Sequence, residues 1–205
     1  MATPRHEFVS YRNGRPIVVG ALEAIGLGIT SGTSRQHRRS GPQHAMSTIE
    51  LPEALKSLDL RPLFSLELRV APLQTIGALG DLRGRVGAIS SGRFAGRLSG
   101  QVLPGGSDWQ SITASEATHL DARIVLETDD GEQIGMEYRG VRRGPPEVLG
   151  RLARGEPVAP TEYYFRITAS FSTAAPALTW LNEIVAVGTG HRLPHGPVYN
   201  LFEVA

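Results

Sequence analysis

Asp108 and Trp109 stand side by side in the stretch "VLPGGSDWQ", directly after two glycines and a serine. A carboxylate that is partly buried has a raised pKa and can act as a general base near neutral pH. Adjacent strand residues point to opposite faces, so only one of the pair can face an interior. Two interpretations follow. Asp108 is the base of a pocket at a barrel mouth, or it bonds the turn amides while Trp109 packs inside.

Other side chains could complete such a site. Glu137 is a second candidate base, while Tyr138 and Tyr164 could donate hydrogen bonds to a developing oxyanion. For each tyrosine the alternative is simple core packing. The candidate substrate-binding residues are aromatic, cationic or amide side chains: Trp109, Arg123, Tyr163, Arg166, Trp180 and Asn182.

The elements that must position these residues show apolar side chains at every second position. The alternating segments are "FSLELRV", "HLDARIVLE", "EQIGMEYRG" and "EYYFRITASF". This period predicts antiparallel strands with one apolar and one polar face. The polar faces carry acids and arginines in equal number: Glu67, Asp121, Glu127, Glu137, Arg69, Arg123, Arg139 and Arg166. These groups either pair on an outer surface or line a polar lumen, and alternation alone does not distinguish the two.

Turn and helix signals complete the predicted architecture. "TDDGEQ" predicts a hairpin, and the glycine-dense "SSGRFAGRLSGQVLPGG" predicts bends or bulges. "PEVLGRLARG" predicts one short helix and "PALTWLN" a turn or two more, while "NEIVAVGTGHRL" and "GPVYNLFEV" predict a closing hairpin. We therefore expect an all-β fold, a single antiparallel β-barrel of about eight to ten strands with one or two short helices.

Composition and missing motifs exclude several functions. With no cysteine and a net charge of +1, the chain offers no thiolate site and no overall charge that would favour nucleic acid. His191 and His195 are four apart, but Pro194 and Gly196 argue against a helix, so we expect no metal. Walker and Rossmann motifs are absent, and we expect no cofactor. No apolar run is long enough to span a membrane, and we expect a cytoplasmic protein.

The first 45 residues differ from the rest. They contain six Arg and two Glu, and residues 31–45 are polar with no apolar period. We expect residues 1–45 to be a flexible extension, either a solvated tail or a basic arm for an acidic partner, and residues 46–205 to be the barrel domain. Translation starting at Met46, rather than Met1, is an alternative.

The ordered motifs resemble the uncharacterised DUF3237 family, also called UPF0311, from about Leu60 to Val204. They are "LFSLELRVAPLQTIG", "GRFAGRLSGQVLPGGSDWQ", "LDARIVLETDDGEQIGMEYRG", "EYYFRITASF" and "TWLNEIVAVGTGHRL". The resemblance implies a lipocalin-like antiparallel barrel that is often an oligomer, with no established general activity. Where the family commonly has Phe-Glu-Thr, this chain has Phe171-Ser172-Thr173.

Three hypotheses follow. The first is a cofactor-independent lyase, isomerase or cyclase that acts on a small carbonyl or aromatic compound. The second is a non-catalytic protein that binds a small molecule in the same pocket. The third is a structural module whose core is filled.

Overall fold

The computed structural model describes residues 9–12, 15–18 and 49–205 of the 205-residue chain. The chain divides into two compact units, Met1–Ile49 and Glu50–Ala205. In the first unit, strand β1 (Val9–Arg12) pairs antiparallel with β2 (Arg15–Val18). The rest of the expected extension, and Met46, lie outside the described residues.

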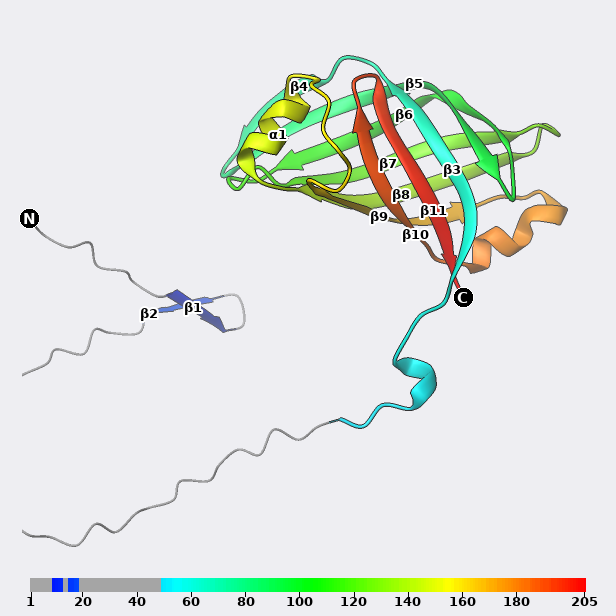
Figure 1. The fold of residues 1–205 in the computed structure, drawn as a ribbon, viewed down its shortest axis with the longest axis horizontal. Helices are drawn as coiled ribbons and strands as arrows, with labels where there is room; N and C mark the ends of the chain where they lie inside the picture. The colour runs from blue at the N-terminus through cyan, green and yellow to red at the C-terminus, as the bar shows by residue number, and fades with distance from the viewer. Residues whose placement is uncertain (1–8, 13–14, 19–48) are drawn as a thin grey trace, which may run out of the picture. The chain divides into compact units, whose positions relative to one another are not determined.

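Nine strands of the second unit form one antiparallel sheet, in which all but β4 close into a barrel (Figure 1). Consecutive strands from β4 to β11 are neighbours, and β3 pairs with both β11 and β5, which closes the ring. The strands are β3 (Leu60–Val70), β4 (Gln74–Leu79), β5 (Leu82–Gly96), β6 (Gly100–Ile112), β7 (Thr118–Thr128), β8 (Gln133–Arg143), β9 (Tyr164–Ser172), β10 (Ala186–Leu193) and β11 (Gly196–Val204). The eight-stranded closed barrel confirms the predicted fold class.

The two faces of each alternating strand separate the core from the outer surface. On β7, for example, Leu120, Ala122, Ile124 and Leu126 are buried inside the barrel. Their polar neighbours face outward, where Arg123 lies 3.5 Å from Glu137. The polar strand faces are therefore the outer surface, and their exposed ion pairs contribute little stability each.

Glycines let β5 and β6 bend around the barrel. The register of β6 shifts against β7 between Leu103 and Ser107, and Gly105 within this bulge has φ of +107°. A Cβ on Gly106 would lie 2.7 Å from the Arg123 carbonyl oxygen. The "PGG" stretch is therefore a bend that only glycine permits, and it delivers the next residues to the end of the barrel that holds the site.

Short helices lie at the two ends of the barrel (Figure 1). Helix α1 (Pro146–Ala153) follows β8 and has Pro at its start, as predicted. The 3₁₀ helix η2 (Pro176–Glu183) follows β9, and η1 (Glu53–Leu55) precedes the barrel. Within the described ranges, no helix has the length and apolarity needed to cross a membrane.

Candidate functional site in the barrel interior

Asp108 points into the barrel and Trp109 points out of it. The carboxylate side chain is 2% exposed, whereas Trp109 is 53% exposed and its Nε1 donates to Ser107 Oγ at 3.2 Å. The interpretation in which Trp109 packs inside the barrel and Asp108 bonds the turn amides is therefore wrong. The reason is strand parity: after the bulge, Asp108 and Gln110 share the inward phase of β6.

The Asp108 carboxylate is only partly satisfied by hydrogen bonds. Its Oδ2 accepts a bond from Gln110 Nε2 at 2.7 Å, and Gln110 Oε1 in turn accepts one from Arg85 Nε at 2.8 Å. Its Oδ1 is buried and has no hydrogen-bond partner among the described residues. Burial raises the pKa of Asp108 from 3.8 to about 6, against the opposing effects of the Gln110 bond and the nearby arginines. Asp108 therefore titrates close to neutral pH.

Two tyrosines lie in the same interior. Tyr138 on β8 and Tyr199 on β11 are fully buried, with ring centroids 5.4 Å apart. Within the described structure, neither hydroxyl has a hydrogen-bond partner, and each tyrosine influences the pKa of the other. Burial, and the charge of Asp108, raise the pKa of both hydroxyls. Both are therefore neutral O–H donors at physiological pH.

Three arginines from different strands complete the polar interior. Arg142 on β8 is 8% exposed, donates weakly to Thr118 Oγ1 at 3.5 Å and lies 5.7 Å from the Phe165 ring centroid. Arg192 on β10 has a buried Nη1 with no partner among the described residues. Burial lowers the pKa of Arg142 to about 10 and also lowers those of Arg85 and Arg192. All three guanidinium groups stay charged at neutral pH.

A cavity of about 230 Å³ lies at the barrel end that carries α1, and its lining includes Asp108, Gln110, Tyr199 and the three arginines but not Tyr138. Leu149, Leu152 and Ala153 of α1 form part of its wall, so the helix covers the polar cluster. At the rim, Arg83 Nη2 donates to Glu116 Oε1 at 2.6 Å. A cavity engineered at about 150 Å³ in another protein admits benzene, so this one can hold a single substituted ring.

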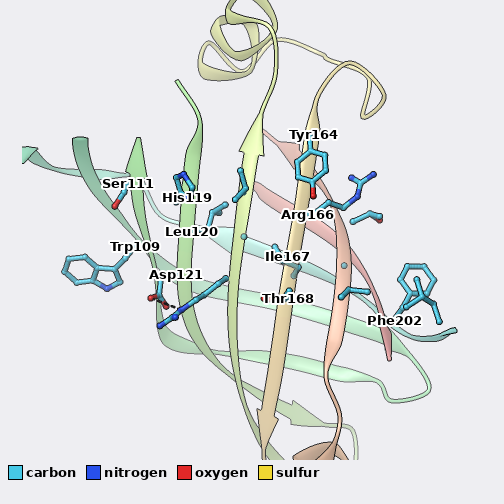
Figure 2. A pocket seen from close by; sticks show the side chains of 17 residues that line it. Trp109, Ser111, His119, Leu120, Asp121, Tyr164, Arg166, Ile167, Thr168 and Phe202 are labelled. Carbon is cyan, nitrogen blue, oxygen red and sulfur yellow. Dashed lines mark ion pairs between the residues drawn. The ribbon is translucent and has the colours of Figure 1, made fainter. Parts of the chain in front are cut away.

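A larger hollow of about 1080 Å³ lies on the outer strand faces, and Figure 2 shows Trp109, Asp121, Tyr164 and Thr168 on its strands. Its acidic and basic side chains are solvated: Asp121 pairs with Arg139 at 3.3 Å, and both are more than half exposed. The outer hollow is the larger of the two. The interior cavity is the better candidate for a catalytic site, because it holds buried titratable groups, which proton-transfer chemistry requires.

The structure divides the residues proposed from sequence into two sets. Asp108 and Tyr138 are both buried inside the barrel, whereas Glu137, Arg123 and Tyr164 face outward. Arg166 also lies outside, with its guanidinium carbon 5.1 Å from the Tyr164 ring centroid.

The remaining candidates have structural contacts. Tyr163 accepts a hydrogen bond from the Arg192 backbone N–H at 2.8 Å and contacts His191 Nδ1 at 2.9 Å, which fixes the backbone beside Arg192. Trp180 and Asn182 both lie on η2. The guanidinium carbon of Arg97 lies 4.4 Å from the Trp180 ring centroid, and Asn182 makes two hydrogen bonds to the Thr173 backbone.

Sequence reasoning missed several interior polar residues: Arg85, Gln110, Arg142, Arg192 and Tyr199. A signal was present in the alternation. Arg142 has the same parity as Ile134, Met136 and Tyr138, so it is a charge at an apolar-phase position. Such a residue must face the core, and a buried charge needs a reason.

Metal ligands do not gather in the described part of the chain, where no three His, Asp or Glu side chains form a group that could hold an ion. His195 instead bonds Glu67 Oε1 at 3.0 Å, and His191 bonds Tyr163.

The fold and the site define a closed antiparallel β-barrel with a small polar cavity at one end. Residues 58–204 match the model of the family described as "Protein of unknown function (DUF3237)", and the chain belongs to that family. It is 36% identical over 149 residues to a UPF0311 protein of Rhodopseudomonas palustris, a match that covers 72% of this chain and 97% of that protein. A UPF0311 protein of Bradyrhizobium diazoefficiens is 35% identical over 148 residues, with the same coverage.

Solved structures show the same architecture. The crystal structure of the Rhodopseudomonas palustris protein aligns with a TM-score of 0.71 at 36% identity and covers 73% of this chain and 99% of its own. A "beta-barrel like protein" from Acinetobacter baumannii aligns with a TM-score of 0.65 at 35% identity, covering 77% and 100%. An enzyme from Penicillium herquei aligns with a TM-score of 0.58 at 20% identity, covering 76% and 100%, which establishes a likeness of fold alone.

Proposed function

We propose that the barrel is a cofactor-independent enzyme that moves a proton on a small carbonyl or phenolic compound, with Asp108 as the general base. The observation that carries this proposal is the buried Oδ1 of Asp108, which has no hydrogen-bond partner among the described residues and lies in a cavity that Tyr199 also lines. A lyase, isomerase or cyclase of this kind needs a base, an oxyanion donor and an apolar wall.

Each interior group has a role in this chemistry. Asp108 Oδ1 removes a proton from a carbon next to a carbonyl group, or from a phenol oxygen. Tyr199, which lines the cavity, donates its O–H to the oxygen on which negative charge develops. Leu120, Phe165 and the α1 leucines exclude water and hold the hydrocarbon part.

The pKa of Asp108 suits this role. With a pKa of about 6, the carboxylate is mostly ionised at pH 7, yet it is a stronger base than an ordinary aspartate. The reaction rate should therefore rise with pH and level off above about pH 7, since the ionised form is the active one.

Exchange of α-hydrogens in D₂O tests the proposal. Cyclohexanone and acetophenone are incubated with the protein, and the loss of their α-proton signals is followed by ¹H NMR. We expect catalysed exchange, a loss of about 10²-fold or more in Asp108→Asn, and no change in the outward-facing Glu137→Gln. Exchange that persists in Asp108→Asn would refute the role of Asp108. Binding of these compounds with exchange at the buffer rate would favour the alternative, a non-catalytic small-molecule binding protein.

A further inference from the structure

The charges that line the interior cavity are out of balance. Arg85, Arg142 and Arg192 bring three positive charges, and Asp108 brings one negative charge when ionised, so the surplus is two. The other acid in the described lining, Glu116, is already paired with Arg83 at 2.6 Å. In the described structure, no guanidinium group of the three has a carboxylate oxygen within 4.0 Å.

Such a surplus is costly inside a protein unless a ligand compensates it. A buried cation loses its hydration, and the loss is recovered only through an opposite charge or several hydrogen bonds. Arg142 is more than nine-tenths buried and has one long hydrogen bond, to Thr118, while Arg192 leaves Nη1 without a partner among the described residues. The cluster therefore has the donors of an anion site but no anion from the described chain.

The remaining walls restrict the kind of anion. Much of the remaining lining is apolar, with Val70, Leu73, Leu120, Leu152 and Phe165 beside the polar Gln110, Thr118 and Tyr199. The apolar side chains offer no hydrogen bonds, so a strongly hydrated ion such as phosphate would lose water without replacement where it faces them. An anion with one charged end and a hydrocarbon body fits both parts of the lining.

We propose that the cavity binds a small organic acid in its carboxylate form, with the carboxylate held by Arg142 and Arg192 and the hydrocarbon body against the apolar wall. The inference rests on the proposed function, because it names the substrate class of the same cavity. The planar guanidinium fork matches a carboxylate and can donate two parallel hydrogen bonds to it. The volume of about 230 Å³ limits the body to about one ring.

Binding of the carboxylate by Arg142 and Arg192 also orients the substrate in the cavity. When the carboxylate contacts the arginines of β8 and β10, the rest of the substrate shares the cavity with Asp108 and Gln110 of β6. The atom that loses its proton is then the one that lies against Asp108. The arginines thus position the substrate, and Asp108 performs the chemistry.

Calorimetric titration of the full chain at low chloride tests the anion class. The probes are benzoate and phenylacetate, the neutral isostere benzamide, and inorganic phosphate. We expect both carboxylates to bind at least about tenfold more tightly than benzamide or phosphate, since only they satisfy both the arginines and the apolar wall. Equal binding of benzoate and benzamide, tighter binding of phosphate, or no binding of either carboxylate overturns the proposal.

Matched arginine variants locate the anchoring groups. Arg142→Met should weaken benzoate binding at least about tenfold, whereas Arg139→Met should leave it unchanged. Arg139 lies three residues earlier on the same strand, but faces outward and pairs with Asp121 at 3.3 Å. Arg192→Met on β10 repeats the test if Arg142→Met does not fold. An equal loss of benzoate affinity in Arg139→Met and in the interior variants would refute the assignment of Arg142 and Arg192 as the groups that bind the carboxylate.

Failure of this inference and failure of the proposed function give different results. Benzoate binding that depends on Arg142, without any α-hydrogen exchange, supports the anion site and refutes the proton-transfer activity. Asp108-dependent exchange of a neutral ketone, without carboxylate binding, supports the activity and refutes the anion site. Asp108→Asn should bind benzoate at least as tightly as the wild type, since the change removes a negative charge from the cavity.

Discussion

Asp108→Asn should stabilise the folded barrel at alkaline pH. Because burial raises the pKa of Asp108 from 3.8 to about 6, keeping this group ionised in the fold costs about 3 kcal/mol relative to the unfolded chain. Asparagine has nearly the same shape, can still accept the Gln110 hydrogen bond and carries no charge. At pH 8 the variant should therefore be more stable by about 3 kcal/mol, or about 6–12 °C in Tm.

The gain should depend on pH in a defined direction. Since the folded state binds the proton more tightly, the contribution of Asp108 to stability is fully present below about pH 4 and is lost as the pH rises through about 6. The difference between Asp108→Asn and the wild type should accordingly be near zero at pH 4 and reach its full size at pH 7–8.

Urea denaturation of both proteins between pH 4 and pH 8, followed by intrinsic fluorescence, measures this difference. The outward-facing Asp121→Asn is the control, because Asp121 is solvated and more than half exposed. A stability difference that is the same at pH 4 and pH 8, or one that appears equally in Asp121→Asn, would refute the conclusion that burial of Asp108 destabilises its ionised form.

Two more substitutions test the positions around the site. Gly106→Ala should lower the free energy of unfolding by about 1–3 kcal/mol, because its Cβ would lie 2.7 Å from the Arg123 carbonyl oxygen. The urea midpoint measures this, with Gly84→Ala, where the nearest atom is at 3.4 Å, as a control that should change little. Tyr199→Phe should leave stability unchanged or slightly raised, since the hydroxyl has no hydrogen-bond partner among the described residues. The same variant should slow α-hydrogen exchange by about 10²-fold if Tyr199 is the oxyanion donor, and an unchanged rate would remove it from that role.

The strands were predictable from the sequence because burial of one face forces a period of two. "HLDARIVLE" and "EQIGMEYRG" became β7 and β8, and the glycine of "TDDGEQ", Gly131, has the positive φ of +86° that the hairpin turn requires. The proline at the start of α1 marked its helix equally well. Short-range sequence features determine these elements, so they can be predicted from a few neighbouring residues.

The site was only partly predictable, because its members come from different strands. Asp108 and Tyr138 were identified by their chemistry, but Glu137 and Tyr164 have the same chemistry and the opposite parity. Which parity faces inward depends on barrel closure, a property of the whole sheet. The arginine of β8, Arg142, was overlooked because arginine usually belongs to a solvated face.

The closure of the ring by β3 has a consequence for how the chain folds. The last strand, β11, lies between β10 and β3, and Val198 pairs with Glu67. Contacts between such distant segments form late, since a long loop must be closed first. Arg192 and Tyr199 belong to β10 and β11, so a chain in which only the strands up to β9 have formed still lacks two of the cavity groups. A ligand of the cavity would therefore bind and stabilise only the completed barrel, and would distinguish it from every shorter folding intermediate.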